Sequence, residues 1–365
     1  MPFVRVLALC VLCLYACGPR EPIRIGLIAG LSSRTSDTGE GARNGLLLAI
    51  EQRNAQGGIQ GRKIEMVAAD DGQDPVKAVQ AINELIAARP SIILGPLTSS
   101  MAEAVLPVVN QSNVVLLSPV ITSLQFVGKD DMFFRLNRTT RDNAEEYSRE
   151  MLADGQRRVA IAYDIRNRSF TESWLHEFRR AFQERGGTIS SAVSFASSAD
   201  TAFGEVSRQL LASHPQGLLF IANAIDVARL AQQARKHAPA IPLTAVEWAA
   251  SEQLLELGGK AVEGLLIAQS HNRADTSPRF TAFVEAYRQR FHQEPGYTAV
   301  ATYDAATVFF TAMERRQPNE PLKAALLRCG PYQLLQQQIE FTPYGDTTRQ
   351  VYFTRIQNGR FVLVR

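Results

Sequence analysis

The chain has 365 residues, of which 45% are hydrophobic and 21% are charged. This is enough apolar material for a packed core, and it argues against a disordered, collagen-like or low-complexity protein. At about 100–200 residues per domain, the length predicts two domains. The 39 Lys and Arg nearly balance the 36 Asp and Glu, which gives a net charge of +3. Because the basic residues form no block, we predict no nucleic-acid partner.

The N-terminus has the pattern of an export signal. After Arg5, an apolar run over residues 6–16 is shorter than the roughly 20 residues of a membrane span but fits a signal peptide. It ends in Leu14-Tyr15-Ala16-Cys17, which resembles a bacterial lipobox. We therefore expect residues 1–16 to be removed, Cys17 to be acylated, and the exported protein to be anchored by lipid on the periplasmic or extracellular side. The alternative is an ordinary secretory signal that is cleaved nearby.

The cysteines and histidines predict neither a disulfide nor a metal site. Once the signal peptide is removed and Cys17 is acylated, Cys329 is left without a cysteine partner. The histidines lack ligand spacing and are expected on the surface: His176, His214, His237, His271 and His292. Asp70, Asp71 and Asp74 are interpreted as strand-end and helix-capping residues rather than as metal ligands. We predict no metal and no cofactor.

Short runs rich in Val, Ile and Leu, bounded by Gly, Pro, Asp or Ser, predict β-strands. In chain order these runs are residues 23–29, 64–69, 92–95, 114–118, 159–163, 217–222, 243–246 and 264–268. Amphipathic stretches with helical period lie between them. Asp74-Pro75 predicts a helix start, and Arg185 followed by two glycines predicts a helix end.

The alternation of strands and helices predicts an α/β fold with parallel sheets covered by helices on both faces. A second strand–helix series begins with a helix near residues 140–143, and no Pro/Gly/Ser linker precedes it. Towards the C-terminus, helices are expected at 278–292, 298–315 and 321–327. Residues 350–356 and 361–364, separated by Asn358-Gly359, predict a hairpin.

The ends of the predicted strands carry the candidate site. In open parallel sheets, ligands bind beyond the carboxyl ends of the strands. Residues 98–100 and 119–123 follow two such strands and offer hydroxyl and N–H groups that suit a carboxylate. The strands of the second half end in Asp164, Asn223 and Glu247. Helix capping is the alternative for Ser99, Ser100 and Thr122, but hydroxyl-rich ends in one half and an acidic end in the other favour a binding cleft.

Enzyme motifs are mostly absent. The chain lacks a G-x-S-x-G elbow, a phosphate-binding P-loop and an H-E-x-x-H zinc motif. The glycines at 26 and 30 do not have the G-x-G-x-x-G spacing of a dinucleotide site. We therefore predict a binding protein and not an enzyme.

Motifs follow one another in a recognisable order. They are Ile25-Gly26-Leu27, Asp37-Thr38-Gly39, Gly45 with Ala49-Ile50-Glu51, residues 54–61, Asp70-Asp71 with Asp74-Pro75, Gly95-Pro96 with Ser99-Ser100, Ser118-Pro119 and Phe134-Arg135. This series resembles the leucine/isoleucine/valine-binding family of type I periplasmic substrate-binding proteins, which serve branched-chain amino acid ABC transporters. Looser matches continue to about residue 356, among them Asp164, Glu247 and Tyr303-Asp304-Ala305.

The resemblance implies two α/β lobes, joined by a hinge of crossing segments, that close over a ligand. Residues 23–138 and 270–346 would form the first lobe, and residues 139–269 and 347–365 the second. An amino acid or a similar small molecule would lie between them. The expected partners are ABC permease subunits and, through the lipid anchor, a membrane.

The resemblance also implies residue roles. Ser99, the backbone of Val120, and Thr122 would hold the ligand carboxylate. Glu247 would pair with an α-ammonium group. Two further positions, where branched-chain-binding relatives often place tyrosines, are occupied by Phe170 and Asn223.

Departures from the family pattern leave the ligand open. Phe170 keeps an aromatic wall without a hydroxyl, and Asn223 replaces an aromatic ring with an amide. Arg166 and Arg168 lie on the loop that leads to Phe170, which indicates either an anionic or larger ligand or a solvated loop. A lipid-anchored receptor of an ABC importer is the first functional prediction. The alternative is a two-lobed sensor or regulatory protein for amides or organic acids.

Overall fold

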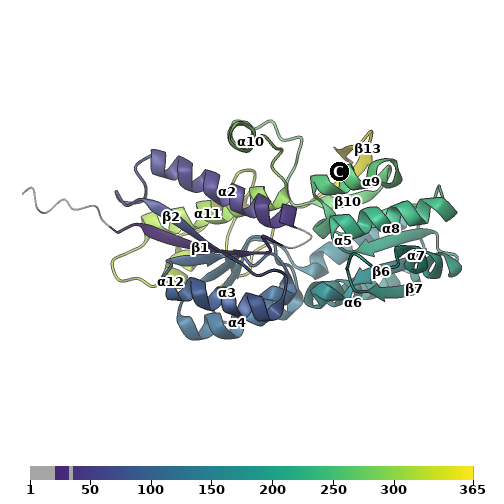
Figure 1. Ribbon diagram of the computed structural model, residues 1–365, viewed down its shortest axis with the longest axis horizontal. Helices are drawn as coiled ribbons and strands as arrows, with labels where there is room; N and C mark the ends of the chain where they lie inside the picture. Colours follow the sequence, from purple (N-terminus) through teal and green to yellow (C-terminus); the bar gives the residue numbers. More distant parts are fainter. Residues whose placement is uncertain (1–20, 33–35, 365) are drawn as a thin grey trace, which may run out of the picture.

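The computed structural model describes residues 21–32 and 36–364. The chain forms two α/β lobes that lie side by side (Figure 1). We call lobe 1 the part around a five-stranded sheet and lobe 2 the part around a seven-stranded sheet. The predicted signal peptide and Cys17 lie outside the described residues.

Lobe 1 contains a fully parallel sheet in the order β2-β1-β3-β4-β5. Its strands are β1 (Ile23–Ala29), β2 (Ile64–Asp70), β3 (Ile92–Leu94), β4 (Leu116–Ser118) and β5 (Phe133–Arg135). Ile25 and Leu27 pack towards α2 (Ser36–Ala55), α11 (Tyr297–Arg315) and α12 (Leu322–Arg328). Ile28 and Ile93 pack towards α3 (Pro75–Ala87) and α4 (Ser99–Ser112). Helices on both faces explain why these strands are continuous apolar runs.

Lobe 2 has the order β14-β13-β10-β9-β8-β6-β7. The strands are β6 (Arg158–Asp164), β7 (Thr188–Phe195), β8 (Gly217–Ile221), β9 (Leu243–Ala245), β10 (Leu266–Gln269), β13 (Tyr352–Gln357) and β14 (Arg360–Leu363). β13 and β14 form the predicted C-terminal hairpin, and β13 pairs antiparallel with β10. The other pairs are parallel.

Alternate residues of the lobe 2 strands serve two cores. Val159 and Ile161 pack with α5 (Thr140–Ala153) and α6 (Arg168–Glu184). Ala160 and Ala162 belong to the core with α7 (Phe203–Ala212), α8 (Ala224–His237) and α9 (Glu252–Gly258). The period of two is that of a strand covered on both faces. The remaining elements are η1 (Leu124–Phe126), η2 (Ile165–Asn167), η3 (Glu247–Ala249), η4 (Gly259–Val262), α10 (Pro278–Phe291), β11 (Tyr332–Gln333) and β12 (Gln338–Ile339).

Helix ends follow the sequence signals. Asp74 caps α3 and accepts hydrogen bonds from the backbone N–H groups of Val76 and Lys77. Thr139 and Asp142 form a reciprocal capping box at the start of α5, an arrangement that satisfies two N–H groups of the first turn. These caps fix where the loops of the strand ends give way to helix.

The chain crosses between the lobes in segments held by buried ion pairs. One crossing follows β5, where Arg135 Nε lies 2.8 Å from Asp346 Oδ1. The last crossing precedes β13, where Arg349 Nη2 lies 2.8 Å from Asp304 Oδ2 and both side chains are almost fully buried. Removing one partner of a buried ion pair leaves an uncompensated charge and destabilises the fold. These two pairs therefore fix the crossing segments to lobe 1.

The two lobes touch along the side chains of α4, η1 and α6. The Ser100 N–H donates to Asn167 Oδ1 at 3.1 Å, and Ser123 Oγ donates to the Ser169 carbonyl at 2.6 Å. The Leu124 N–H reaches Ser173 Oγ at 3.4 Å. Ser169 Oγ also donates to the Glu103 carboxylate on α4. Hydrogen bonds, one of them to a charged group, therefore hold the lobes together at one side of the interlobe space.

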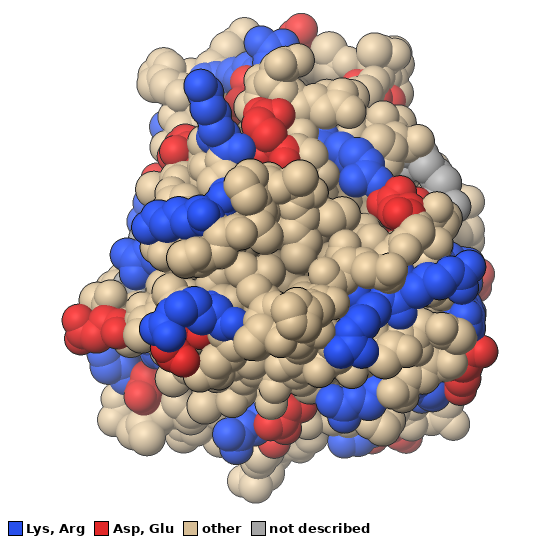
Figure 2. All heavy atoms as spheres, turned by 90° about the vertical axis from the view of Figure 1, so that its right-hand side faces the viewer, with Lys and Arg blue, Asp and Glu red and all other residues tan. Residues whose placement is uncertain are grey.

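The surface charge is mixed. On the end of lobe 2 shown in Figure 2, Lys and Arg side chains alternate with Asp and Glu around broad uncharged areas. In the described residues, no helix combines the length and the apolar character needed to cross a membrane. Within the same ranges, no three or more His, Cys, Asp or Glu side chains are grouped to hold a metal.

The histidine prediction is wrong at one position. His271 is 2% exposed and lies beside the Phe280 ring, with the ring centroids 6.0 Å apart. Burial lowers the pKa of its imidazole well below the usual value, and the Arg273 and Arg349 charges act in the same direction. His271 is therefore a neutral core residue, two residues after the end of β10, where the sequence offers no apolar periodicity to reveal it.

Candidate ligand-binding site

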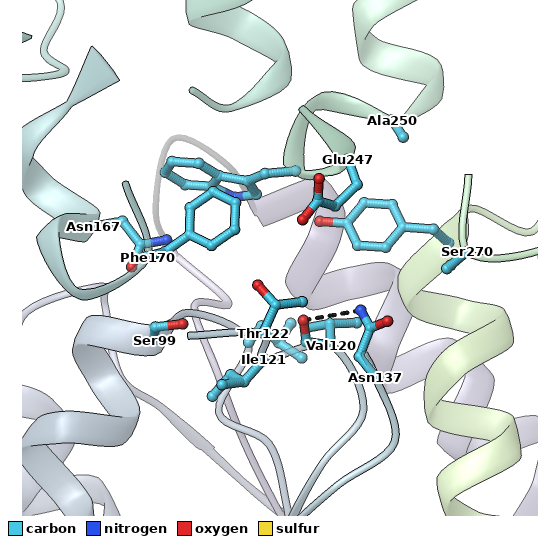
Figure 3. Close-up of a pocket in the computed structure, with 13 residues that line it drawn as sticks. Ser99, Val120, Ile121, Thr122, Asn137, Asn167, Phe170, Glu247, Ala250 and Ser270 are labelled. Carbon is cyan, nitrogen blue, oxygen red and sulfur yellow. Dashed lines mark hydrogen bonds between the residues drawn. The ribbon is translucent and has the colours of Figure 1, made fainter. Parts of the chain in front are cut away.

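A cavity lies between the lobes, at the carboxyl ends of both sheets. We call it the ligand chamber. Its lining residues are Leu97, Ser99, Val120, Ile121, Thr122, Asn137, Asn167, Phe170, Glu247, Trp248, Ala250, Ser270 and Tyr297. Figure 3 shows Ser99, Val120 and Thr122 on one side and Phe170 and Glu247 on the other. The chamber thus draws on both lobes.

The loops after β3 and β4 form the lobe 1 wall. Gly95, with φ of +103°, turns the chain after β3, and a Cβ at this position would lie 2.1 Å from the Ile28 carbonyl oxygen. Only glycine fits this turn. The chain then enters α4 at Ser99, and the capping residue Thr98 makes no side-chain bond to the helix. The N-terminus of α4 therefore keeps its capacity to attract an anion.

Thr122 supplies a buried hydroxyl to the same wall. The residue is 2% exposed, and its Oγ1 has no hydrogen-bond partner within residues 21–32 and 36–364. A buried polar group without a partner costs about 1–3 kcal/mol. Since Thr122 lines the chamber and its side chain points towards Glu247 in Figure 3, a bound polar molecule would satisfy it.

Val120 lies beside Thr122 and is fixed through its backbone. Its carbonyl oxygen accepts from Asn137 Nδ2 at 3.3 Å, the contact drawn in Figure 3. Asn137 stands next to the crossing segment after β5. The position of the Val120 backbone in the chamber is therefore coupled to the hinge.

Glu247 provides the charge of the lobe 2 wall. It begins η3, two residues after the end of β9. Its Oε1 accepts from Asn143 Nδ2 at 2.7 Å, and its Oε2 accepts from Trp174 Nε1 at 3.4 Å. Although the residue keeps some exposure to the cavity, protein surrounds the carboxylate. This burial raises the pKa of Glu247, while the bonds from Asn143 and Trp174 oppose the rise.

Aromatic side chains enclose the chamber. The rings of Phe170 and Trp248 meet edge to face, with centroids 5.7 Å apart. Tyr297, at the first turn of α11, brings a third ring from lobe 1. Burial raises the pKa of the Tyr297 hydroxyl, and the nearby carboxylates of Asp37 and Glu247 raise it further. The neutral phenol of Tyr297 therefore lies close to the Glu247 carboxylate.

A second cavity adjoins the first, and we call it the side chamber. It is lined by Gly72, Gln73, Thr98, Met101, Asp164, Arg166, Asn167, Ser197, Asn223 and Trp248. Asn223 lies here and not in the ligand chamber. Its Oδ1 accepts from the Asp226 N–H at 3.1 Å and its Nδ2 donates to Asp226 Oδ2 at 2.7 Å. The amide of Asn223 thus caps α8.

The structure brings together five of the six residues predicted for the ligand. The residues around the ligand chamber are Ser99, Val120, Thr122, Phe170 and Glu247. Sequence reasoning missed Tyr297, Asn137 and Asn167. Gly296 before Tyr297 indicates the start of a helix, but nothing in the local sequence indicates that Tyr297 lines a cavity. Asn143 and Trp174, the partners of Glu247, lie on helices and carried no signal.

Chain topology and cavity together define a two-lobed binding protein whose ligand lies between α/β lobes at the carboxyl ends of the strands. Residues 22–360 match the periplasmic binding protein family. The match spans most of the chain, so the chain belongs to this family.

Individual relatives agree with this assignment. The leucine-, isoleucine-, valine-, threonine- and alanine-binding protein of Pseudomonas aeruginosa is 22% identical over 331 residues, which are 89% of this chain and 87% of that protein. The branched-chain amino acid transporter substrate-binding protein LivJ of Streptococcus pneumoniae, solved with isoleucine, is 20% identical with a TM-score of 0.86 and covers 94% of this chain and 99% of its own. A solute-binding protein of an ABC transporter from R. palustris, solved with benzoate, is 16% identical with a TM-score of 0.84 and covers 94% of this chain and 95% of its own. The structural likenesses define the fold.

Proposed function

We propose that this protein is the solute-binding component of an ABC importer and that it binds an α-amino acid between its lobes. The observation that carries the proposal is the ligand chamber, which has a buried hydroxyl without a partner on the lobe 1 side and a carboxylate on the lobe 2 side. A zwitterion supplies an acceptor to the first and a donor to the second. Membership of the periplasmic binding protein family supports the transport role.

In this proposal the amino acid lies across the chamber with its carboxylate towards lobe 1. Ser99, at the N-terminus of the 14-residue helix α4, the Val120 backbone and the Thr122 hydroxyl hold the carboxylate. Glu247 holds the ammonium. Phe170 and Trp248 cover the apolar part of the ligand. None of these roles requires a bond to be made or broken, and the protein acts by binding and release.

The same proposal includes a membrane anchor and a hinge. Cys17 carries lipid, and ABC permease subunits receive the closed protein. Lobe 1 comprises residues 23–138 and 270–346, and lobe 2 comprises residues 139–269 and 347–365. Ligand contacts made from both lobes favour the closed arrangement over the open one.

A receptor for organic acids is the competing function. The benzoate complex has this fold, and an aromatic acid would use the hydroxyl groups of lobe 1 and the Phe170 ring. Such a ligand would leave Glu247 without an ammonium group. A buried carboxylate without a cationic partner is costly, and this favours an amino acid.

Calorimetric titration with three matched compounds tests the proposal. L-Leucine, 4-methylpentanoate and 3-methylbutylamine share an aliphatic chain and differ in the charged groups. We expect binding of the amino acid and loss of most of the affinity for either compound with one charged group. Tighter binding of 4-methylpentanoate or benzoate than of any L-amino acid in the same series would overturn the amino-acid proposal and favour an organic-acid receptor.

A further inference from the structure

The side chamber adjoins the ligand chamber on the side of the loops after β2 and β8. The two cavities share Asn167 and Trp248. Thr98, on the side-chamber wall, lies between two residues of the ligand chamber, Leu97 and Ser99. A ligand held by its carboxylate and ammonium between the lobes therefore has the side chamber beside it, across Asn167 and Trp248.

We propose that the side chamber receives the ligand's side chain and selects a carboxamide, so that the preferred ligand is a glutamine-like amino acid rather than a branched-chain one. This inference rests on the proposed function, because it takes the α-amino acid head to be held by Ser99, Thr122 and Glu247.

The walls of the two chambers differ in polarity. Leu97, Ile121 and Phe170 give the ligand chamber a largely apolar lining. In the side chamber, Met101 and Trp248 are the large apolar side chains, and every other lining residue is glycine or polar. An aliphatic side chain gains free energy by leaving water for apolar surroundings. The side chamber offers little of that gain, and a group that forms hydrogen bonds binds there more favourably than an aliphatic one.

Two opposite charges face the side chamber. Asp164 ends β6 and is 1% exposed, and its Oδ1 accepts from the N–H groups of Arg166 and Ser197, both at 3.0 Å. Arg166 is exposed, and its Nη1 donates to the Ser197 carbonyl at 3.1 Å. In the described part of the chain, no carboxylate lies within ion-pair distance of the Arg166 guanidinium, and Asp164 interacts with it only at longer range. Arg166 therefore retains donors for a ligand.

This pair of charges discriminates among ligand side chains. A carboxylate would attract Arg166 but repel Asp164, and an ammonium group would do the reverse. An uncharged carboxamide has a carbonyl oxygen for the guanidinium and an N–H for a carboxylate. Hydrogen bonds to charged partners are stronger than those between neutral groups. The carboxamide is therefore the side-chain group that both charges accept.

The other polar residues of the chamber fit this assignment. Both polar atoms of the Asn223 amide form hydrogen bonds with Asp226. Asn223 therefore lines the side chamber but is not the residue that selects the ligand's side chain. Thr98 makes no capping bond to α4 and keeps its hydroxyl for the chamber. Arg168 lines neither chamber. It pairs with Glu172 on the exposed surface of α6, with 3.0 Å between Nε and Oε1.

Calorimetric titration of the full mature chain with L-glutamine, L-leucine, L-glutamate, L-lysine and glutaramic acid, which is glutamine without its α-amino group, tests the inference. We expect L-glutamine to bind at least about tenfold more tightly than the other amino acids, which is the equivalent of one good hydrogen bond to a charged group. Leucine should bind measurably through the shared amino-acid head.

Three variants assign the selectivity to the side chamber. Arg166→Ala should weaken the affinity for L-glutamine by about 10- to 100-fold and change the affinity for L-leucine by no more than about twofold. Arg168→Ala, two residues further along the same surface, is the matched control and should change neither. Thr98→Val keeps the side-chain shape and removes the hydroxyl. It should therefore lower the affinity for L-glutamine and raise the affinity for L-leucine.

The outcomes separate this inference from the proposed function. If L-leucine binds more tightly than L-glutamine and Arg166→Ala affects both equally, the protein is an amino-acid receptor and the carboxamide assignment is wrong. If L-glutamate binds most tightly, the selected group is a carboxylate, and the assignment is wrong as well. If glutaramic acid binds in an Arg166-dependent manner while no amino acid binds, the carboxamide assignment stands and the amino-acid proposal fails.

Discussion

Replacing Glu247 with glutamine is the sharpest test of the ligand chamber. The substitution keeps the volume of the side chain and leaves one oxygen to accept from Asn143 Nδ2, which lies 2.7 Å from Oε1. It removes the negative charge that we assign to the ligand ammonium. Glu247→Ala would be a poorer choice, because it would also deprive Asn143 and Trp174 of their acceptor and cost about 1–3 kcal/mol for each donor left without a partner.

The expected magnitude follows from the surroundings of the carboxylate. Removing one partner of a buried ion pair costs about 3–5 kcal/mol when the other charge is left uncompensated. Here Asn143 and Trp174 already donate to Glu247, so the carboxylate does not depend on the ligand alone. We therefore expect a loss of binding free energy at the lower end of this range, about 3 kcal/mol, which lowers the affinity for the amino acid by a little over 100-fold.

Calorimetry on the wild type and Glu247→Gln measures this effect, with Glu172→Gln as the control. Glu172 is an exposed residue of α6 that lines neither chamber, and its variant should bind like the wild type. An amine-free analogue of the ligand should bind Glu247→Gln no more weakly than it binds the wild type. If Glu247→Gln binds the amino acid within about threefold of the wild type, less than one kcal/mol, the ammonium is not at Glu247 and the orientation of the ligand is wrong.

Further predictions concern pH, closure and the anchor. Folding raises the pKa of Glu247, so its ionised carboxylate destabilises the unliganded fold above that pKa. Acidification from the raised pKa down to the ordinary value should therefore increase the melting temperature of the wild type relative to that of Glu247→Gln. The same acidification should weaken amino-acid binding, because the carboxylate loses its charge. Ser123→Ala removes the interlobe bond to Ser169 and should weaken binding about 2- to 10-fold and expand the liganded protein in small-angle scattering, unlike Ser112→Ala, which removes a bond within lobe 1. Cys17→Ser should release the protein from the membrane fraction or block its processing in cell fractionation, because acyl chains provide the attachment, and normal retention would refute the lipobox.

The sheets could be predicted where the strands are buried on both faces. β1 has the predicted bounds, Ile23–Ala29, because helices cover both sides and the run is continuously apolar. β7 (Thr188–Phe195) was missed. It is an edge strand of the lobe 2 sheet with a half-exposed pattern and three serines, so no continuous apolar run marks it.

The candidate site could be predicted only in part, for a related reason. Ser99, Thr122 and Glu247 lie within five residues of the end of a strand, and the topology of a parallel sheet places strand ends together. Asn143 and Trp174 contact Glu247 from helices that are far away in the sequence, and no local pattern predicts such a contact. A position after a strand also leaves two roles open, a ligand contact or a helix cap. At Asn223 the structure has the cap.

The arrangement of hydrogen bonds explains how an empty receptor can remain open and still close on its ligand. Asn143 and Trp174 belong to lobe 2 like Glu247, so opening the lobes leaves the carboxylate with both donors. Across the contact between the lobes, Ser169 Oγ donates to the Glu103 carboxylate, and the other direct bonds there join neutral groups such as Ser123 and Ser169. Each neutral bond contributes only about 0.5–1.5 kcal/mol, because water replaces it in the open state. In the proposed function, a zwitterion between Thr122 and Glu247 would add charge-assisted bonds to both lobes at once, and these bonds would exist only when the lobes are closed. The ligand would then determine the closed state, and the serine contacts would set what part of the interaction free energy appears as affinity.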